Sequence, residues 1–519
     1  MGNITRSWVL PPRGLRVLLL SLLVMGIFFR FINLDRKVYW HDEAFTSLRI
    51  SGYTTSEIVD QMVENPGMTR EDLQKYQSPN PHKGIADTIT SLATEDSQHP
   101  PLYYLLARWW VQAFGYSVAG IRSLSAVISL LAFPCIYWLC LELFNSSFVG
   151  WVAIALIAVS PFHILYAQEA REYSLWIVTI LLSSAALLYG RRLNTRRSWS
   201  LYSGSLILGL YTFPLTGLVA IGHGIYMLGI EQFRLNKRII HYLLATGVGF
   251  LAFAPWLFVM IANLSKISDT NAWSAERLPL LSLLKAWILN LTRLFLDIDF
   301  SFTNPLTYLI APIIIFIGYS LVFLLLNTPK RIGLFILTLV GVTGLTLILP
   351  DLILGGQRSK VIRYLIPSFI GIQLACAFLI TMKLTSPQVL RQKLWSISAL
   401  TILYLGIVSG ASSFQSATWW NKFQSNDNVP IAQLINQTEN AEVISDKFGI
   451  LFSLKYNLEP SVKLKFVKDI EIFDKLLIKS NKPFIVTTDR KFINQLKQIY
   501  DLSLVYRGGI GLWTVNTKN

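Results

Sequence analysis

Apolar stretches of about 20 residues recur along most of this 519-residue chain, and they restrict its fold more than any other feature. A stretch of that length can cross a bilayer as a helix, which satisfies its own backbone hydrogen bonds where no water is present. Charged residues make up only 15% of the chain, whereas about 25% is usual in soluble domains. The sequence therefore predicts an α-helical polytopic membrane protein and excludes a soluble globular enzyme, a disordered chain and a disulfide scaffold.

The apolar stretches give about eleven predicted transmembrane helices. They lie near residues 15–32, 120–143, 149–166, 172–190, 200–214, 216–230, 239–263, 306–327, 332–350, 364–382 and 394–411. The first is expected to stay as an anchor, because no small-residue cleavage site follows it.

Basic residues in the short loops give the predicted orientation, because Lys and Arg are retained on the cytoplasmic side. Arg191, Arg192, Lys330, Arg331 and Lys383 fall in loops on one side, which is predicted to be cytoplasmic and to include the N-terminus. An odd number of spans then places the C-terminus outside, and we expect the plasma (inner) membrane. The basic residues that give the chain its net charge of +16 are therefore explained by membrane topology, and no nucleic-acid partner is predicted.

Two hydrophilic regions fall on the predicted outer face. One is a long first loop near 33–118, within a membrane module that covers 1–411. The other, 412–519, is predicted to be a small C-terminal α/β extracytoplasmic domain. Its strand-like runs lie at 442–445, 462–467, 483–487 and 502–506 and alternate with helix-like runs.

The first cluster of polar residues is Asp42-Glu43, which follows Trp40 and His41 a few residues beyond the first span. A carboxylate beside aromatic residues at a membrane surface has the chemistry of a general base. A solvated pair of loop acids explains the same residues, because charged side chains are usually exposed. On the residues alone both interpretations stay open.

The second cluster is His99-Pro100-Pro101, followed by Tyr103 and an apolar run. Proline is tolerated in the first turn of a helix but not in its interior, so a helix is predicted to begin here and to cover 102–114. It is too short to span a bilayer and is therefore predicted to be interfacial or re-entrant. A simple interfacial anchor would have the same sequence.

The third cluster, with Gln168, Glu169, Arg171 and Glu172, occupies an outward turn between two predicted spans. Unpaired charges are costly in hydrocarbon, so these side chains must contact water, one another or a polar ligand. A salt-bridged corner and a binding site satisfy that requirement equally.

The fourth cluster contains Arg358, Lys360, Arg363 and Tyr364, and it falls on the predicted outer face against the general trend of charge. Flexible cations at headgroup depth are suited to a phosphate or pyrophosphate, and Arg offers a two-pronged donor. Contact with lipid headgroups is the alternative.

In order and context, the four clusters resemble those of the GT-C membrane glycosyltransferases. The resemblance is to the glycosyltransferase family 39-like group, which contains protein O-mannosyltransferases and aminoarabinose transferases, and it covers about residues 15–385. It is carried by Asp-Glu at 42–43, His-Pro-Pro-Leu-Tyr-Tyr at 99–104, Gln-Glu-Ala-Arg-Glu-Tyr at 168–173 and Arg-Tyr-Leu-Ile-Pro at 363–367. The resemblance implies a GT-C-like fold.

The resemblance also implies a reaction, in which a sugar moves with inversion from a polyprenyl-phosphate carrier to an acceptor hydroxyl at the outer face. Asp42 would be the catalytic base, supported by Glu43. The departing phosphate would be met by cations of the third and fourth clusters or by a divalent cation; these residues are Arg171, Arg358, Lys360, Arg363 and also His99. Other substrate contacts would be Tyr103, Gln168, Glu169 and Tyr364. The acceptor, whether glycan, lipid or protein, is not implied.

The chain departs from the aminoarabinose transferases at two positions. They carry Arg two residues after their Asp-Glu pair, where this chain has Phe45, and Lys before Pro-Pro, where it has His99. The C-terminal region also does not resemble the sugar-binding insert of the eukaryotic protein O-mannosyltransferases. Lipid A modification is therefore not expected, and the substrate does not transfer from the resemblance.

A metal site is left open by the sequence. His41, Asp42, Glu43 and His99 are possible ligands of a divalent cation, but they show no fixed ligand spacing. The cysteines lie in apolar segments, so neither a disulfide nor a cysteine metal site is expected; they are Cys135, Cys140 and Cys376.

Two other classes of protein remain alternatives. A secondary transporter fits the number of spans, but its ionisable residues would be expected near the bilayer midplane, whereas the clusters here gather toward one face. A non-catalytic scaffold fits the external domain but leaves the clustering of Asp42, Arg171 and Arg363 unexplained.

Overall fold

The computed structural model describes residues 13–79, 81–298, 300–301, 303–477 and 483–515. They form two compact units. Unit 1 contains residues up to Ile32, Ser97–Tyr103 and Ser125–Ser413, and unit 2 contains Asn33–Asp96, Tyr104–Leu124 and the chain from Phe414 onward. Unit 2 therefore combines the first loop with the C-terminal region, which the sequence analysis assigned to separate domains.

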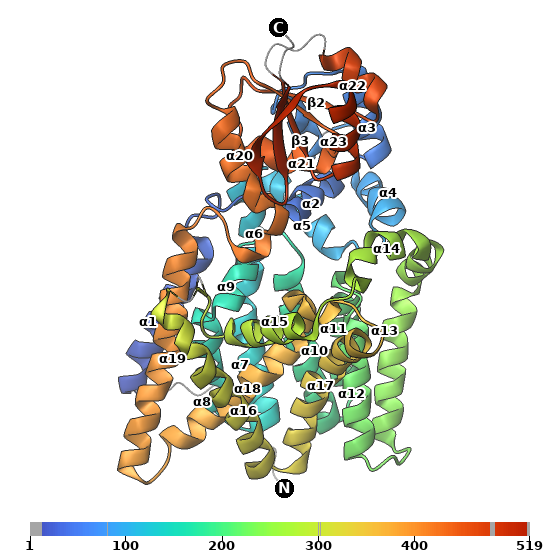
Figure 1. The fold of residues 1–519 in the computed structure, drawn as a ribbon. Helices are drawn as coiled ribbons and strands as arrows, with labels where there is room; N and C mark the ends of the chain where they lie inside the picture. Colours follow the sequence, from blue (N-terminus) through green and yellow to red (C-terminus); the bar gives the residue numbers. More distant parts are fainter. Residues whose placement is uncertain (1–12, 80, 299, 302, 478–482, 516–519) are drawn as a thin grey trace. The chain divides into compact units, whose positions relative to one another are not determined.

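Unit 1 is built from helices (Figure 1). They are α1 (Arg13–Phe31), α7 (Ala132–Phe144), α8 (Ser147–Val159), α9 (Pro161–Ala167), α10 (Tyr173–Leu193), α11 (Arg196–Thr212), α12 (Thr216–Ile230), α13 (Lys237–Ala262), α14 (Leu264–Thr270), α15 (Leu280–Thr292), α16 (Ile310–Asn327), α17 (Lys330–Ile353), α18 (Ile366–Leu384) and α19 (Val389–Gln415). Two short turns, η4 (Arg358–Lys360) and η5 (Ile362–Leu365), precede α18. Helix α6 (Val118–Leu130) has residues in both units.

Within the described ranges, eight helices are long and apolar enough to cross a membrane, or nine if α8 and α9 form one span bent by 61°. A helix stands at each of the eleven predicted stretches, but α11 has 17 residues and α12 has 15, so neither passes the length test. The apolar helix α15 was not predicted. The polytopic helical fold is thus confirmed, whereas the count of eleven spans is not.

A bend separates α8 from α9, and the residues of the third cluster follow directly after the end of α9. Ser160 is extended, with φ −64° and ψ 121°, and Pro161 starts α9. Proline disfavours helical backbone at the residue before it, so α8 must end there. Helix α9 is a single short run that ends at Ala167, and the turn with Gln168 and Arg171 follows.

Unit 2 contains short helices and a sheet (Figure 1). The helices are α2 (His41–Ser51), α3 (Thr55–Glu64), η1 (Asp72–Tyr76), α4 (Ile85–Glu95), most of α5 (Leu102–Phe114), η6 (Trp420–Asp427), α20 (Asn428–Ile435), α21 (Phe448–Leu454), η7 (Lys455–Asn457), α22 (Ile470–Leu477) and α23 (Arg490–Ile499). Helix α5 has the bounds predicted from Pro100-Pro101.

The five-stranded sheet has the order β2-β1-β3-β5-β4. Its strands are β1 (Glu442–Ser445), β2 (Lys463–Phe466), β3 (Pro483–Thr487), β4 (Leu502–Arg507) and β5 (Gly511–Val515). Strand β1 pairs in parallel with β2 and β3, and β5 pairs antiparallel with β3 and β4. The predicted α/β character of this region is confirmed, although β5 was missed.

The sheet is packed on an apolar core and extended by the first loop. Residues of β1, β3, α22 and α23 bury their side chains together, with Ile444, Phe473, Ile485 and Leu496 at 8% exposure or less. At the edge strand, the Leu464 amide donates to the carbonyl oxygen of Met68 at 2.7 Å. This bridge is one of the contacts that unite the first loop and the C-terminal region in unit 2.

Candidate active site

The predicted catalytic acids lie in the first turn of α2, in unit 2. The partial positive charge of a helix N-terminus favours carboxylates there. The two side chains differ in environment, because Asp42 is half-buried whereas Glu43 is completely buried. Only Asp42 therefore keeps part of its surface accessible.

Glu43 is held by two cations that the sequence analysis did not single out. Arg122 donates from Nε to Glu43 Oε1 at 2.7 Å and from Nη2 to Oε2 at 2.6 Å, and Lys422 Nζ lies 3.4 Å from Oε2. The other guanidinium hydrogens of Arg122 bind the carbonyl oxygens of Leu34, Lys37 and Val38. A bidentate pair with this many hydrogen bonds is fixed in one geometry. We call Glu43, Arg122 and Lys422 the Glu43 cluster.

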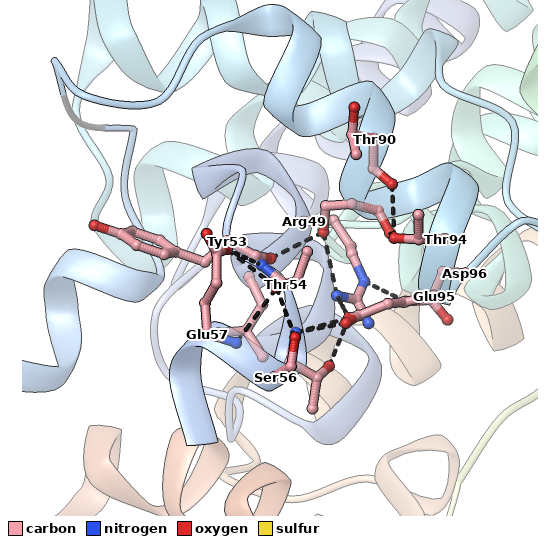
Figure 2. A network of polar contacts seen from close by, with 12 residues as sticks. Arg49, Tyr53, Thr54, Ser56, Glu57, Thr90, Thr94, Glu95 and Asp96 are labelled. Atoms are coloured by element: carbon pink, nitrogen blue, oxygen red, sulfur yellow. Dashed lines mark hydrogen bonds and ion pairs between the residues drawn. The ribbon is translucent and has the colours of Figure 1, made fainter. Parts of the chain in front are cut away.

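The other end of α2 is fixed by Arg49 (Figure 2). Figure 2 shows Arg49 reaching Glu95 and Asp96 at the end of α4; its Nε lies 2.5 Å from Asp96 Oδ2, and it also pairs with Glu95. Burial acts to lower the pKa of Arg49, but the two carboxylates outweigh burial and raise it. Arg49 therefore stays charged, and ion pairs hold α2 at both ends.

In unit 1, the side chains of His99, Arg171 and Glu172 all lie within polar contact of one another. We call these three residues the Glu172 cluster. His99 Nδ1 lies 3.0 Å and Arg171 Nη2 3.2 Å from Glu172 Oε1, and Arg171 Nη2 lies 3.4 Å from His99 Nε2. The imidazole ring therefore lies between the two groups, with Nδ1 near the carboxylate and Nε2 near the guanidinium.

Glu172 is an anion in this cluster. Burial acts to raise its pKa, but the charges of Arg171 and His99, and a hydrogen bond from His99, lower the pKa to about 2. Glu172 lies between two candidate spans and not within one. Its negative charge in turn holds the guanidinium of Arg171 in place.

The third and fourth sequence clusters meet at Tyr173. The guanidinium carbon of Arg171 lies 5.8 Å from the centre of the Tyr173 ring, and that of Arg363 lies 5.7 Å from it. Arg363 also lies 5.6 Å from the centre of the Tyr364 ring. Aromatic rings attract guanidinium groups through their negative faces. Two predicted phosphate-binding arginines therefore share one aromatic ring.

The unpredicted helix α15 holds the fourth cluster. Trp287 Nε1 donates to Ser359 Oγ at 3.0 Å, and Asn290 Nδ2 donates to the Lys360 carbonyl oxygen at 2.9 Å. Arg358 pairs with Asp351 at 3.2 Å, while Lys360 is exposed. Arg171 and Arg363 both lie at the Tyr173 ring, whereas the contacts described for Arg358 and Lys360 do not include that ring.

The other predicted substrate contacts have structural hydrogen bonds. Gln168 Nε2 donates to the carbonyl oxygens of Phe29 and Ile32, which ties the third cluster to the end of α1. The Tyr103 hydroxyl lies 2.8 Å from Ser125 Oγ, and that hydroxyl donates to the carbonyl oxygen of Arg171. Glu169 is buried beside Tyr166. Their roles toward a substrate stay predictions.

No group of three or more His, Cys, Asp or Glu side chains in the described part of the chain is placed to hold a metal ion. The Glu43 carboxylate, a possible ligand from the sequence, is bound on both oxygens by cations. The divalent cation that the sequence left open therefore stays a prediction.

One missed residue carried a signal in the sequence. Arg122 lies in an apolar stretch of span length, and an ionisable residue in such a stretch is expected to have a specific partner. Tyr173 belongs to the motif at 168–173 but was not assigned a role, and Lys422 carried no signal because a lysine in a polar segment is common.

Comparison with solved structures defines the class of this fold. ArnT from Cupriavidus metallidurans bound to undecaprenyl phosphate matches with a TM-score of 0.55 and 13% identity, over 97% of this chain and 98% of that chain. The oligosaccharyltransferase of Archaeoglobus fulgidus matches with a TM-score of 0.51 and 12% identity, over 96% of this chain and 74% of that chain. The chain therefore has an ArnT-like fold, in line with the fold that the resemblance implied.

The family model of dolichyl-phosphate-mannose-protein mannosyltransferases matches residues 98–258, which include the Glu172 cluster and Tyr173. A search of curated proteins found no match. The family model and the shared fold confirm the resemblance to GT-C enzymes of the protein O-mannosyltransferase and ArnT type.

Proposed function

We propose that this protein is an inverting glycosyltransferase of the plasma (inner) membrane. It takes a sugar from a polyprenyl-phosphate carrier and transfers it to an acceptor hydroxyl at the extracytoplasmic face. The observation that carries the proposal is the meeting of Arg171 and Arg363 at Tyr173, next to the Glu172 cluster. Undecaprenyl phosphate bound to ArnT, a protein of the same fold, supports a polyprenyl-phosphate donor.

The arginines of unit 1 bind the phosphate of the donor in this proposal. Arg171 is 4% exposed, and Glu172 keeps its guanidinium oriented, so little ordering is needed when a phosphate binds. His99 is more accessible, at 19%, and provides a further hydrogen-bond donor or acceptor. When the carrier leaves, negative charge grows on its phosphate, and fixed guanidinium groups stabilise that charge.

Asp42 of unit 2 acts as the general base. It takes the proton of the acceptor hydroxyl while the acceptor oxygen bonds to the anomeric carbon of the sugar. The bond from that carbon to the phosphate oxygen breaks, and its electron pair leaves with the polyprenyl phosphate. Attack from the side opposite the phosphate inverts the configuration, as in inverting glycosidases, and no covalent intermediate is formed.

Transfer from a radiolabelled polyprenyl-phosphate sugar to membrane acceptors, by the full chain in lipid, tests the proposal. Asp42→Asn keeps the size of the side chain and removes the base, so turnover should fall by about 100-fold or more while donor binding is retained. Asp35→Asn is a matched control, because Asp35 is an exposed acid of the same segment.

Three outcomes would count against the proposal. Equal transfer by the native protein and Asp42→Asn would remove Asp42 from the chemistry. Unchanged donor affinity in Arg363→Gln would remove this arginine from the phosphate site. Uptake of a solute into vesicles, without glycosyl transfer from any donor in the panel, would favour a secondary transporter.

A further inference from the structure

The helix that carries Asp42 is capped by a residue from the C-terminal region. Trp40 occupies the N-cap position of α2, and its side chain caps no backbone amide. Ser425 Oγ instead accepts a hydrogen bond from the amide of His41 at 3.0 Å. The first amides of a helix have no partner within the helix, so a cap of this kind fixes where the helix begins.

A second residue of the same segment holds the side of α2. Lys422 is 1% exposed, and its amine lies 3.4 Å from Glu43 Oε2 and 5.3 Å from the centre of the Trp40 ring. Lys422 and Ser425 both belong to η6. His41 is therefore bound through its amide and Glu43 through its carboxylate, one on each side of Asp42 in the sequence.

The position of η6 is set by the sheet. Asp427 at the end of η6 accepts from the hydroxyl of Tyr506 in β4 at 2.9 Å and from the amide of Ile510, just before β5, at 2.8 Å. A Cβ added at Gly508 would lie 2.6 Å from Asp427 Oδ1, so the hairpin approaches η6 closely. The β4–β5 hairpin thus holds η6, which is the segment that contacts α2.

Backbone contacts join the two chain segments that lead into α2 and η6. The Val38 amide donates to the carbonyl oxygen of Ala417 at 2.8 Å, and Arg36 Nε donates to that of Gln415 at 2.6 Å. Farther along, Phe45 of α2 packs on Phe448 of α21 with ring centres 5.7 Å apart. The C-terminal region therefore contacts the segment that leads into α2 and also the second turn of the helix.

We propose that Lys422 and Ser425 are positioning residues for Asp42, so that the C-terminal region is part of the catalytic apparatus. The inference rests on the proposed role of Asp42. Ser425 fixes the start of α2, and Lys422 fixes the carboxylate next to Asp42. Together they set the direction in which the Asp42 side chain leaves the helix.

The test compares four variants of the full chain in lipid nanodiscs: Lys422→Met, Lys422→Arg, Ser425→Ala and Ser425→Thr. Lys422→Met is expected to lower kcat by about 10- to 100-fold, as expected for a misplaced catalytic group, with the donor KM changed by less than about twofold. Ser425→Ala is expected to have a smaller effect in the same direction. Lys422→Arg and Ser425→Thr keep the charge and the hydroxyl, and should recover most of the activity.

A second measurement reads the position of α2 without catalysis. Hydrogen–deuterium exchange at residues 41–46 should be faster in Lys422→Met and Ser425→Ala than in the native chain. Lys447→Met is the control, since Lys447 is an exposed lysine of the same region paired with Asp446 and Asp489. It should change neither kcat nor exchange in α2.

The outcomes separate this inference from the proposed function. Native kcat and native exchange in Lys422→Met and Ser425→Ala would overturn the positioning role. A raised donor KM with native kcat would also overturn it, because these residues would then act on the donor. If the native chain transfers no sugar, the proposed function fails, and exchange in α2 alone decides whether η6 supports the helix.

Discussion

Two buried glutamates, Glu43 in unit 2 and Glu172 in unit 1, each pair with an arginine and a second basic residue, yet their surroundings differ. Arg122 and Lys422 are both 1% exposed, and Glu43 receives cations at both oxygens. At Glu172, His99 and Arg171 converge on the same oxygen, and His99 is 19% exposed. The first carboxylate is enclosed and the second lies beside a group that water or a ligand can reach.

The difference in exposure indicates that the two ion-paired glutamates have different roles. A fully enclosed ion pair has one geometry, and it suits the support of a helix. A carboxylate that orients an arginine and a partly accessible histidine suits a site where an anion binds and leaves. A sequence pattern of acidic residues beside aromatic ones cannot distinguish the two.

The largest expected effect is that of Glu43→Gln. It removes the buried carboxylate that Arg122 and Lys422 both contact, which should destabilise the protein by about 3–5 kcal/mol. Thermal unfolding in detergent measures this loss. Glu57→Gln is the control, because Glu57 pairs with Lys83 at a more exposed site and should cost about 1 kcal/mol or less. Equal melting temperatures would mean that the Glu43 cluster is not a structural support.

Glu172 should make stability depend on acid pH. Its pKa is lowered from 4.5 to about 2, so its stabilisation is present above pH 4.5 and is lost as the pH falls toward 2. The shift corresponds to about 3 kcal/mol. Melting temperatures of the native chain and Glu172→Gln should therefore converge between pH 5 and pH 2, within the approximate window set by these two pKa values. A constant difference across that range would contradict the assignment of an anionic Glu172.

Tyr173→Leu should weaken donor binding without removing either arginine. Loss of a cation–π contact of about 0.5–2 kcal/mol predicts a donor KM raised by about 2- to 30-fold. The control lies on the same helix, because Arg192 contacts the ring of Tyr189 at 5.2 Å. Tyr189→Leu should leave the donor KM unchanged, and an equal rise in both variants would point to a general effect on α10.

The smallest expected effect is that of Arg358→Gln. Arg358 pairs with Asp351 and is not among the residues described at Tyr173, so the donor KM should change by about twofold or less. Arg363→Gln should raise it by about tenfold, as expected for a charge-assisted hydrogen bond to phosphate. Similar effects in the two variants would show that the whole fourth cluster faces the donor.

Local patterns in the sequence predicted the elements that depend on local physics. Pro100-Pro101 fixed the start of α5, because proline is favoured just before or in the first turn of a helix. Short strand-like runs predicted β1 to β4, because β-branched and aromatic residues favour strands. Helix α15 was missed because its 13 residues are too few for a span, although Pro279 precedes it as Pro101 precedes α5.

Pairings between distant residues could not be read from the sequence. Glu43 and Arg122 are 79 residues apart, and Glu43 and Lys422 are 379 apart. No local period encodes such contacts, so the joining of the first loop with the C-terminal region in unit 2 was not foreseen. The meeting of Arg171 and Arg363 was expected only in the general sense that both fell on one predicted face.

The contact between Lys422 and Glu43 can form only late in biosynthesis, because Lys422 is synthesised long after Glu43. At about 5–20 residues per second, the ribosome needs roughly 20–75 s to make the 379 residues between them. During that time α2 has been synthesised, but neither its Ser425 cap nor Lys422 exists. The acid-bearing helix is therefore completed late, and a chain released early would have its membrane helices but not the support for Asp42.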